Sequence, residues 1–189
     1  MTLGRSVGSG RSMKHTGVAC ILVLLAVLVV PPAVQADSHV VYVPLIRNAL
    51  LDDSLTWATV VRVSDGDTIK VNIDGCPIEG MKVRLIGIDT PERGECFWAD
   101  AKERTEALVL GQRVALQRDV SEFGPYNRLL RHVYLGDETW VNGVLVGEGY
   151  ARVTTYPPDD RYAGALGYIE AAARASEVGA WGDCGWTSP

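Results

Sequence analysis

The chain has 189 residues, a length that indicates one domain, or one domain with appendages. Its formal charge of −5 argues against tight, sequence-independent binding of a polyanion, because such affinity comes mostly from Lys and Arg. The sequence contains no low-complexity tract and no internal repeat, so its composition is that of a globular protein.

The first 36 residues differ in composition from the rest of the chain. They carry three basic residues and no acid, then an apolar run of 14 residues from Gly17 to Val30, and then the small residues of Val34–Ala36. This order is typical of a secretory signal peptide with its cleavage site. Because a membrane-spanning helix needs roughly 20 apolar residues, we predict a cleaved signal over residues 1–36 and an exported protein. An uncleaved membrane anchor is the alternative.

Residues 37–55 show neither a sustained helical period nor a strand period, so we interpret them as a leader or linker. The pattern typical of a folded domain begins at residue 56. We expect this domain over residues 56–184, followed by a tail over residues 185–189.

The first part of the domain alternates apolar and polar residues as β-strands do. Asp65-Gly66 and Asp74-Gly75 indicate turns, and residues 81–88 form a further apolar run. This spacing predicts a meander of three strands. The inward-facing positions of its first two strands are predicted to be Val61, Val63, Ile69, Val71 and Ile73.

A helical pattern over residues 97–111 follows the meander. Residues 113–118 and 129–135 are predicted to be two more strands, and residues 141–151 a short helix. The clearest helical stripe in the chain runs over residues 162–176. The predicted inward-facing residues of the first two helices are Ala101, Thr105, Leu108 and Val109, and then Val141, Val144 and Leu145.

The order of these elements is three strands, a helix, two strands and two helices. It predicts an α+β fold built on a five-stranded OB-fold β-barrel with three α-helices. Such barrels commonly bind oligonucleotides, although a fold alone does not settle function.

Three cysteines lie outside the predicted signal: Cys76, Cys96 and Cys184. In an oxidising compartment an odd number implies one disulfide and a free thiol, or an intermolecular bond. Cys96 lies at the start of the first predicted helix and Cys184 just beyond the last one. We therefore predict that these two are bonded and that Cys76 is the free thiol.

Acidic residues lie where the strands of the meander end. Asp67 follows the first turn, Asp89 ends the third strand, and Glu92 comes three residues later. Two carboxylates that meet at one rim repel each other unless a hard cation lies between them, and oxygen ligands of this kind suit Ca²⁺. The proline after Thr90 holds that residue in an extended conformation and could aim its carbonyl as a further ligand. The alternative is that the acids of residues 65–67 only serve the turn.

Arg84 lies in the middle of the apolar third strand, where an unpaired charge would be costly to bury. It therefore needs either an anionic ligand or a structural salt bridge to a neighbouring acid. Arg128 lies in the loop that enters the fifth strand. Two arginines and a metal around one pocket are a way to hold a phosphoryl group. Arg131 points to the other face of its strand and is the weaker candidate.

Four segments together resemble the staphylococcal nuclease, or thermonuclease, family: SDGDT, RLIGIDTPE, YNR with the strand after it, and VNGVLVGEGYARV. The resemblance covers residues 56–181. It implies a calcium-dependent phosphodiesterase that cuts DNA and RNA and leaves 3′-phosphates. By motif position, its calcium ligands would be the carboxylates of Asp67 and Asp89 and the carbonyl of Thr90.

The same resemblance implies the catalytic residues. Glu92 matches the family's candidate general base, which activates or orients the attacking water. Arg84 and Arg128 match its two phosphate-binding arginines. The apolar strand with an arginine inside it would thus carry a base, a metal ligand and a phosphate-binding group to one cleavage site.

The chain departs from the family pattern where substrate is bound. Residues 125–128 read Pro-Tyr-Asn-Arg, whereas the best-known member has Lys-Tyr-Gly-Arg, so a possible phosphate contact is lost. Thr155 stands where that member has a base-stacking tyrosine, and Tyr156 is adjacent. We predict Tyr126 and Tyr156 as substrate-binding residues and leave base stacking and substrate preference open.

The resemblance favours a secreted or extracytoplasmic nuclease that acts as a monomer on DNA and RNA. A non-catalytic nucleic-acid-binding OB-fold module is the alternative, but such a module has no need of three acids and two arginines in these positions. An anchored surface protein would result if Ala36 is not a cleavage site. A histidine-metal nuclease is disfavoured, because only His39 and His132 lie outside the signal and neither has a suitable motif.

Overall fold

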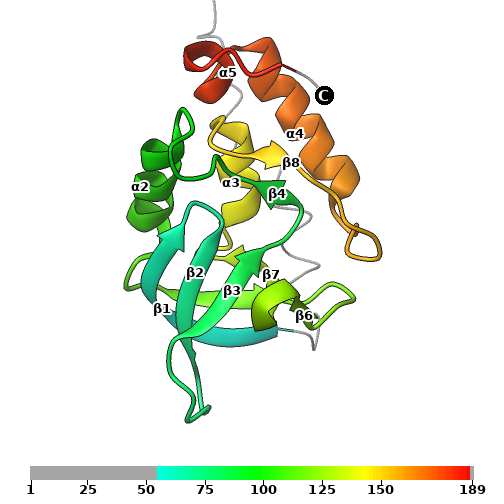
Figure 1. Ribbon diagram of the computed structural model, residues 1–189. Helices are drawn as coiled ribbons and strands as arrows, with labels where there is room; N and C mark the ends of the chain where they lie inside the picture. Colours follow the sequence, from blue (N-terminus) through cyan, green and yellow to red (C-terminus); the bar gives the residue numbers. More distant parts are fainter. Residues whose placement is uncertain (1–54, 188–189) are drawn as a thin grey trace, which may run out of the picture. The chain divides into compact units, whose positions relative to one another are not determined.

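Five segments of alternating apolar and polar residues form a closed barrel in the computed structural model, which describes residues 55–187 (Figure 1). The strands pair in the order β3-β2-β1-β5-β7, and a parallel pairing between β3 and β7 closes the barrel. The α+β class with a five-stranded OB-fold barrel is therefore confirmed. The barrel strands are β1 (Leu55–Asp65), β2 (Thr68–Ile73), β3 (Met81–Leu85), β5 (Arg113–Gln117) and β7 (Arg128–Tyr134).

The three predicted helices are also present, and each turns its apolar stripe inward. They are α2 (Trp98–Val109), α3 (Val141–Gly147) and α4 (Ala163–Ala175). The buried residues of α2 are Ala101, Thr105 and Val109, and those of α4 are Leu166, Ile169 and Ala173. Within residues 55–187, no helix has the length and apolar character needed to cross a membrane.

Several short elements were not predicted. The two-residue strands β4 (Ile88–Asp89) and β8 (Arg152–Val153) pair with each other outside the barrel sheet. The strand β6 (Phe123–Gly124) extends the sheet beside β7, and the short helix α5 (Ala180–Asp183) follows α4 (Figure 1). Elements of two to four residues are too short to show a period, so pattern reasoning misses them.

The register of β1 differs from the prediction. Val61 was expected to face inward, but its side chain is 46% exposed, whereas Val60 and Val63 are buried. The cause is a register shift between Val60 and Arg62 in the pairing with β2. A bulge of this kind adds one residue to a strand and so reverses which side chains face the core. A smaller difference occurs in α3, where Val144 is partly exposed and Val146 is buried.

The third strand ends earlier than predicted. The expected strand over residues 81–88 stops at Leu85, and the chain turns before it enters β4. Gly87 lies in this turn with a φ of 79°, a conformation that L side chains rarely adopt. An added Cβ there would also lie 2.6 Å from the Leu166 side chain. This turn releases Ile88 and Asp89 from the barrel so that they can pair with β8.

Parts of the predicted organisation lie outside the described residues. These are the predicted signal peptide over residues 1–36, residues 37–54 of the predicted leader, and the last two residues of the predicted tail. Leu55, which was assigned to the leader, is the first residue of β1.

His132 is a buried polar residue in this core. It lies on β7 with its ring edge-on to Tyr162 and Trp140, and no hydrogen-bond partner among the described residues contacts either ring nitrogen. Burial, aided by the charge of Arg161, lowers its pKa from 6.5 to about 3. His132 is therefore neutral in the folded protein at pH values where the unfolded chain takes up a proton.

This burial predicts that stability falls with acidification. The folded pKa is depressed, so the stabilisation is complete above the unfolded pKa and is lost as the pH falls from about 6.5 towards about 3. Between pH 8 and pH 5 the free energy of unfolding should fall by about 2 kcal/mol from this group alone. The variant His132→Phe keeps a ring and removes the titration. Its free energy of unfolding should therefore fall by about 2 kcal/mol less between pH 8 and pH 5 than that of the unsubstituted protein. Chemical denaturation at the two pH values tests this, and an equal loss in both proteins contradicts it.

The predicted disulfide is confirmed. Cys96, just before α2, is bonded to Cys184, just after α5, across a sequence separation of 88 residues. Cys76 is the free cysteine of the described residues, as expected. The bond therefore fixes the C-terminal segment to the loop that follows Glu92.

Loss of this bond should destabilise the fold. In the loop-entropy account, replacing Cys96 and Cys184 together by Ser should lower the free energy of unfolding by about 3–5 kcal/mol. The control Cys76→Ser should stay within about 0.5 kcal/mol of the unsubstituted protein, because it removes no bond. Urea denaturation of the three proteins measures the difference. A double variant as stable as the control would show that the bond contributes nothing.

Candidate active site

Arg84 occupies the centre of the site. It lies near the end of β3, opposite Thr68 of β2 and beside Leu130 of β7. Its strand neighbours Val83 and Leu85 are fully buried in the barrel, so the alternation of β3 turns the Arg84 side chain to the outer face. The side chain is nevertheless only 15% exposed, because the segments that follow β3 cover it.

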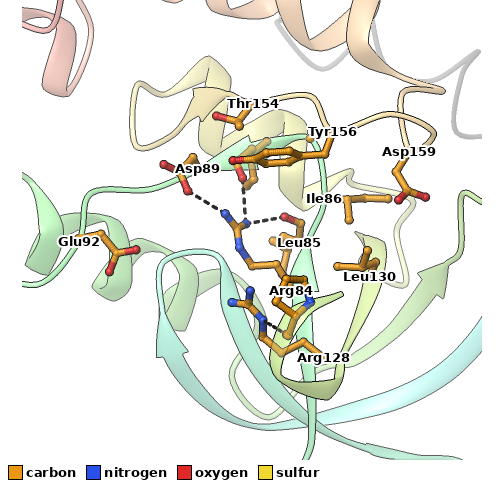
Figure 2. Close-up of a pocket in the computed structure, with 13 residues that line it drawn as sticks. Arg84, Leu85, Ile86, Asp89, Glu92, Arg128, Leu130, Thr154, Tyr156 and Asp159 are labelled. Carbon is orange, nitrogen blue, oxygen red and sulfur yellow. Dashed lines mark hydrogen bonds and ion pairs between the residues drawn. The ribbon is translucent and has the colours of Figure 1, made fainter. Parts of the chain in front are cut away.

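The Arg84 guanidinium connects the two acids that were predicted to bind metal. Its Nη1 donates to the carbonyl oxygens of Leu85 (2.6 Å) and Ile88 (2.8 Å), which fixes the turn after β3. Its Nη2 lies 2.8 Å from Asp89 Oδ1, a contact drawn in Figure 2, and 3.1 Å from Asp67 Oδ2. The salt-bridge alternative for Arg84 is thus present in this structure, and its partners belong to the same site.

Asp67 does more than shape its turn. Its side chain is almost buried, and Oδ2 accepts hydrogen bonds of 3.1 Å from both the backbone N–H and the hydroxyl of Thr90. Its backbone carbonyl accepts from the N–H of Leu85. Gly66 allows this approach, because a Cβ there would lie 2.8 Å from the Thr90 hydroxyl oxygen. The turn between β1 and β2 is therefore packed directly onto the segment that carries Asp89.

Asp89 stands at the edge of the site, with its side chain 53% exposed. Partial burial raises its pKa, and the charges of Asp67 and Glu95 add to the rise, while Arg84 opposes it. Glu92 is exposed on the loop that follows, and its backbone N–H donates to Glu95 (2.7 Å). Its pKa is also raised, by slight burial and by the surrounding acids. Burial is the first cause of both shifts, and the neighbouring acids add to each of them.

The donor set fits a hard cation. Asp67 and Asp89 each place a carboxylate oxygen on the same Arg84 nitrogen, so the fold already gathers two oxygen ligands around a positive charge. Residues 55–187 contain no cluster of three or more His, Cys, Asp and Glu arranged to hold a metal. His132, the one histidine in that range, is buried in the core. Carboxylate oxygens are ligands that Ca²⁺ prefers, whereas a usual zinc site would need a histidine or thiolate cluster, which residues 55–187 do not contain.

A pocket of about 410 Å³ collects most of the predicted catalytic residues. Arg84, Asp89, Glu92 and Arg128 all line it, and Figure 2 shows them around one space. Arg128 Nε donates to the Pro125 carbonyl (3.1 Å), and the Arg128 guanidinium makes no ion pair with another described residue. The pocket therefore contains two different cations: Arg128, which has no acidic partner among the described residues, and Arg84, which is paired with two acids.

The two predicted substrate-binding tyrosines differ in position. Tyr156 lines the pocket and is 72% exposed. Tyr126 is 86% exposed, has a φ of 62°, and lies outside the pocket lining. The Arg128 guanidinium lies 5.6 Å from the centre of its ring. The structure thus brings Tyr156 to the pocket and leaves Tyr126 as a support for Arg128.

Three residues of this region were not singled out from the sequence. Thr154 and Asp159 line the pocket, and Asp159 accepts hydrogen bonds from the N–H groups of Val120 and Ser121. Arg152 of β8 is paired in register with Asp89. No motif marks these positions, and they reach the site only through the β4–β8 pairing and the loop after it.

Comparison with known proteins gives consistent matches. Residues 82–183 match the family described as "Staphylococcal nuclease homologue". A thermonuclease of Staphylococcus intermedius is 37% identical over 128 residues, which are 65% of this chain and 74% of that protein. A thermonuclease of Staphylococcus hyicus is 30% identical over 175 residues, which are 89% of this chain and 99% of that protein. A micrococcal nuclease of Shigella flexneri is 34% identical over 132 residues, 66% of this chain and 72% of that protein.

The family match contains Arg84, Asp89, Glu92 and Arg128, the residues that line the pocket, whereas Asp67 precedes it. The family match includes more than half of the residues of this chain, and the Staphylococcus hyicus relative aligns over most of both proteins. The chain therefore belongs to the staphylococcal nuclease family.

Proposed function

We propose that the protein is a calcium-dependent nuclease that hydrolyses phosphodiester bonds of DNA and RNA and leaves 3′-phosphates. The observation that carries the proposal is the convergence of Arg84, Asp89, Glu92 and Arg128 on one pocket. Membership of the family, and relatives named thermonuclease and micrococcal nuclease, support it. The proposal includes activity as a monomer.

The proposed calcium site consists of the Asp67 and Asp89 carboxylates and the Thr90 carbonyl. When bound, the ion supplies positive charge for the phosphate oxygens. Thr90 also orients Asp67 through its N–H and hydroxyl, so one residue connects the two acidic segments. The ligands are thereby held by backbone and by buried contacts before any substrate arrives.

Glu92 is the proposed acceptor of the proton from the attacking water. It lines the pocket together with Arg84 and Arg128, and its raised pKa strengthens it as a base. Water attacks phosphorus, the bond from phosphorus to the 5′-oxygen breaks, and the phosphate stays on the 3′-oxygen. Arg84 and Arg128 are the proposed ligands of the phosphate oxygens. Arg128 uses only Nε, towards the Pro125 carbonyl, so its two Nη groups are available to a phosphate. Arg84 would have to exchange a carboxylate for the phosphate, because both of its Nη groups are already hydrogen-bonded.

Export is part of the proposal. It rests on the signal-like composition of residues 1–36 and on the Cys96–Cys184 bond, since disulfides persist mainly in oxidising compartments. The acidic net charge then implies modest, salt-sensitive affinity for nucleic acid, with the positive charge concentrated at the site.

Removal of calcium should abolish cleavage. Plasmid nicking should stop in a calcium chelator and return when Ca²⁺ is restored, because the positive charge that the ion supplies for the phosphate oxygens is lost without it. Zn²⁺ should fail to restore it, since the described residues offer no histidine or thiolate cluster. Gel electrophoresis of the plasmid gives the readout. Full activity in the presence of chelator is the result that excludes a calcium enzyme.

Substitution of Glu92 separates an enzyme from a binding module. Glu92→Gln preserves the shape but removes the base, so the single-turnover rate on a short DNA should fall by roughly 10²–10⁴. Its calcium affinity should change little, because Asp67 and Asp89 remain. Asp89→Ala should lose calcium binding first and cleavage as a consequence.

Glu103→Gln is the matched control, since Glu103 is an exposed glutamate on α2 outside the pocket. It should cleave at the unsubstituted rate. If Glu92→Gln also cleaves at that rate, the role of Glu92 is wrong. If the unsubstituted protein binds DNA and never cuts it, the protein is a non-catalytic OB-fold module instead.

A further inference from the structure

Three basic residues lie directly opposite one another on neighbouring strands of the barrel. Arg62 of β1 is paired in register with Lys70 of β2, and Lys70 is paired with Lys82 of β3. Figure 1 shows these strands side by side, with β2 between the other two. Arg62, Lys70 and Lys82 are referred to as the basic row. It crosses three strands at right angles to their direction, over about 10 Å.

The basic row faces away from the barrel interior. Each member of the row has at least one buried neighbour along its strand, whereas Arg62 and Lys82 are exposed and Lys70 is partly exposed. The exposed Val61 beside Arg62 lies at the bulge of β1. Side chains alternate between the two faces of a strand, so the row belongs to the outer face. The buried neighbours are Val63, Ile69, Val71 and Val83.

No described acid neutralises the basic row. Its three side chains make no ion pair and no hydrogen bond within residues 55–187, although like charges placed directly opposite destabilise a sheet. Many other cations of the protein are paired with acids, as expected for a chain of net charge −5. The paired cations include Lys102, Arg104, Arg113, Arg118 and Arg131. Arg93, Arg128 and Arg152 also lack an ion pair among the described residues, but the members of the row differ in being direct neighbours in the sheet. Such a row favours an anion from outside the chain.

The basic row leads into the proposed active site. Lys82 lies two residues before Arg84 on β3, so both side chains belong to the same face, about 7 Å apart along the strand. In the parallel pairing, Val83 is opposite Leu129, which places Arg128 beside Lys82 at the start of β7. The cations therefore continue across four neighbouring strands from Arg62 to the pocket.

We propose that the basic row binds the phosphate backbone of a polynucleotide on one side of the bond that is cut. The inference rests on the proposed function and adds a substrate class to it: chains that extend several nucleotides beyond the pocket. A span of about 15 Å across four strands exceeds one nucleotide, since phosphates along a duplex strand are about 3.4 Å apart along its axis. Contacts to phosphate carry no sequence information, so the row positions the chain without selecting bases.

The experiment compares two double variants with the same net charge. Lys70→Gln with Lys82→Gln removes two cations of the row. Lys102→Gln with Arg118→Gln is the control, because both of its cations lie elsewhere, in ion pairs with residues four positions away. For each protein, kcat/KM is measured on a single-stranded DNA of about 30 nucleotides and on a dinucleotide, at salt concentrations between about 50 and 200 mM.

The row variant should lose about tenfold in kcat/KM on the long DNA at the lowest salt, as a rise in KM. The slope of log kcat/KM against log salt should become shallower by about 1.5, the effect of two lost phosphate contacts. The loss should be absent on the dinucleotide, which cannot reach the row. The control should match the unsubstituted protein on both substrates.

Other results would overturn the inference. Equal losses in the two double variants would show a general effect of charge, and equal losses on the long DNA and the dinucleotide would place the effect in the pocket. If the unsubstituted protein cuts neither substrate, the proposed function fails. The binding of labelled long DNA, measured by fluorescence anisotropy, then tests whether the basic row binds phosphate. Weaker binding by the row variant alone supports a phosphate-binding track, and unchanged binding refutes it.

Discussion

The ion triad of Arg84 with Asp67 and Asp89 is the contact on which the rest of the site depends. One guanidinium joins the start of β2, the end of β3 and the two-residue strand β4, and it also fixes the turn between β3 and β4 through two carbonyl oxygens. Removing Arg84 would leave the nearly buried Asp67 carboxylate without its cation. The same contact therefore closes one rim of the barrel and gathers the groups that the proposed chemistry needs.

The charges of the described surface are segregated around this triad. The acids at the rim raise one another's pKa, which marks a place that favours a cation. The unpaired cations Arg62, Lys70, Lys82 and Arg128 lie on the neighbouring barrel strands, where they favour phosphate. In our proposal, an acidic protein acts on a polyanion because these four unpaired cations lie together on neighbouring strands, where the substrate would bind. The disulfide between Cys96 and Cys184 holds the loop after Glu92. It therefore contributes both to the position of this loop at the site and to the stability of the fold.

Much of the fold was predictable from periodicity, since the barrel strands and three helices repeat their apolar residues over five or more positions. The failures have local causes. A one-residue bulge after Val60 reversed the facing of Val61, and the left-handed Gly87 ended β3 early. The motifs predicted four residues that line the pocket, but not the contact between Asp67 and Arg84. That contact depends on how the β1–β2 turn packs onto Thr90, 23 residues away in sequence. The positive φ of Tyr126 and its place outside the pocket lining were likewise not readable from the sequence, and its substrate-binding role stays a prediction.

The most direct test of this account is a calcium titration of Arg84→Gln by calorimetry, combined with its single-turnover rate on a short DNA. Arg84 places a positive charge on both carboxylates, so its removal should leave calcium affinity at least as high as in the unsubstituted protein. Cleavage should fall at least about 100-fold, because a positioned donor to the phosphate has been lost. Loss of calcium binding would show that Arg84 only supports the fold of the ligands. Cleavage at the unsubstituted rate would show that it does not act on the substrate at all.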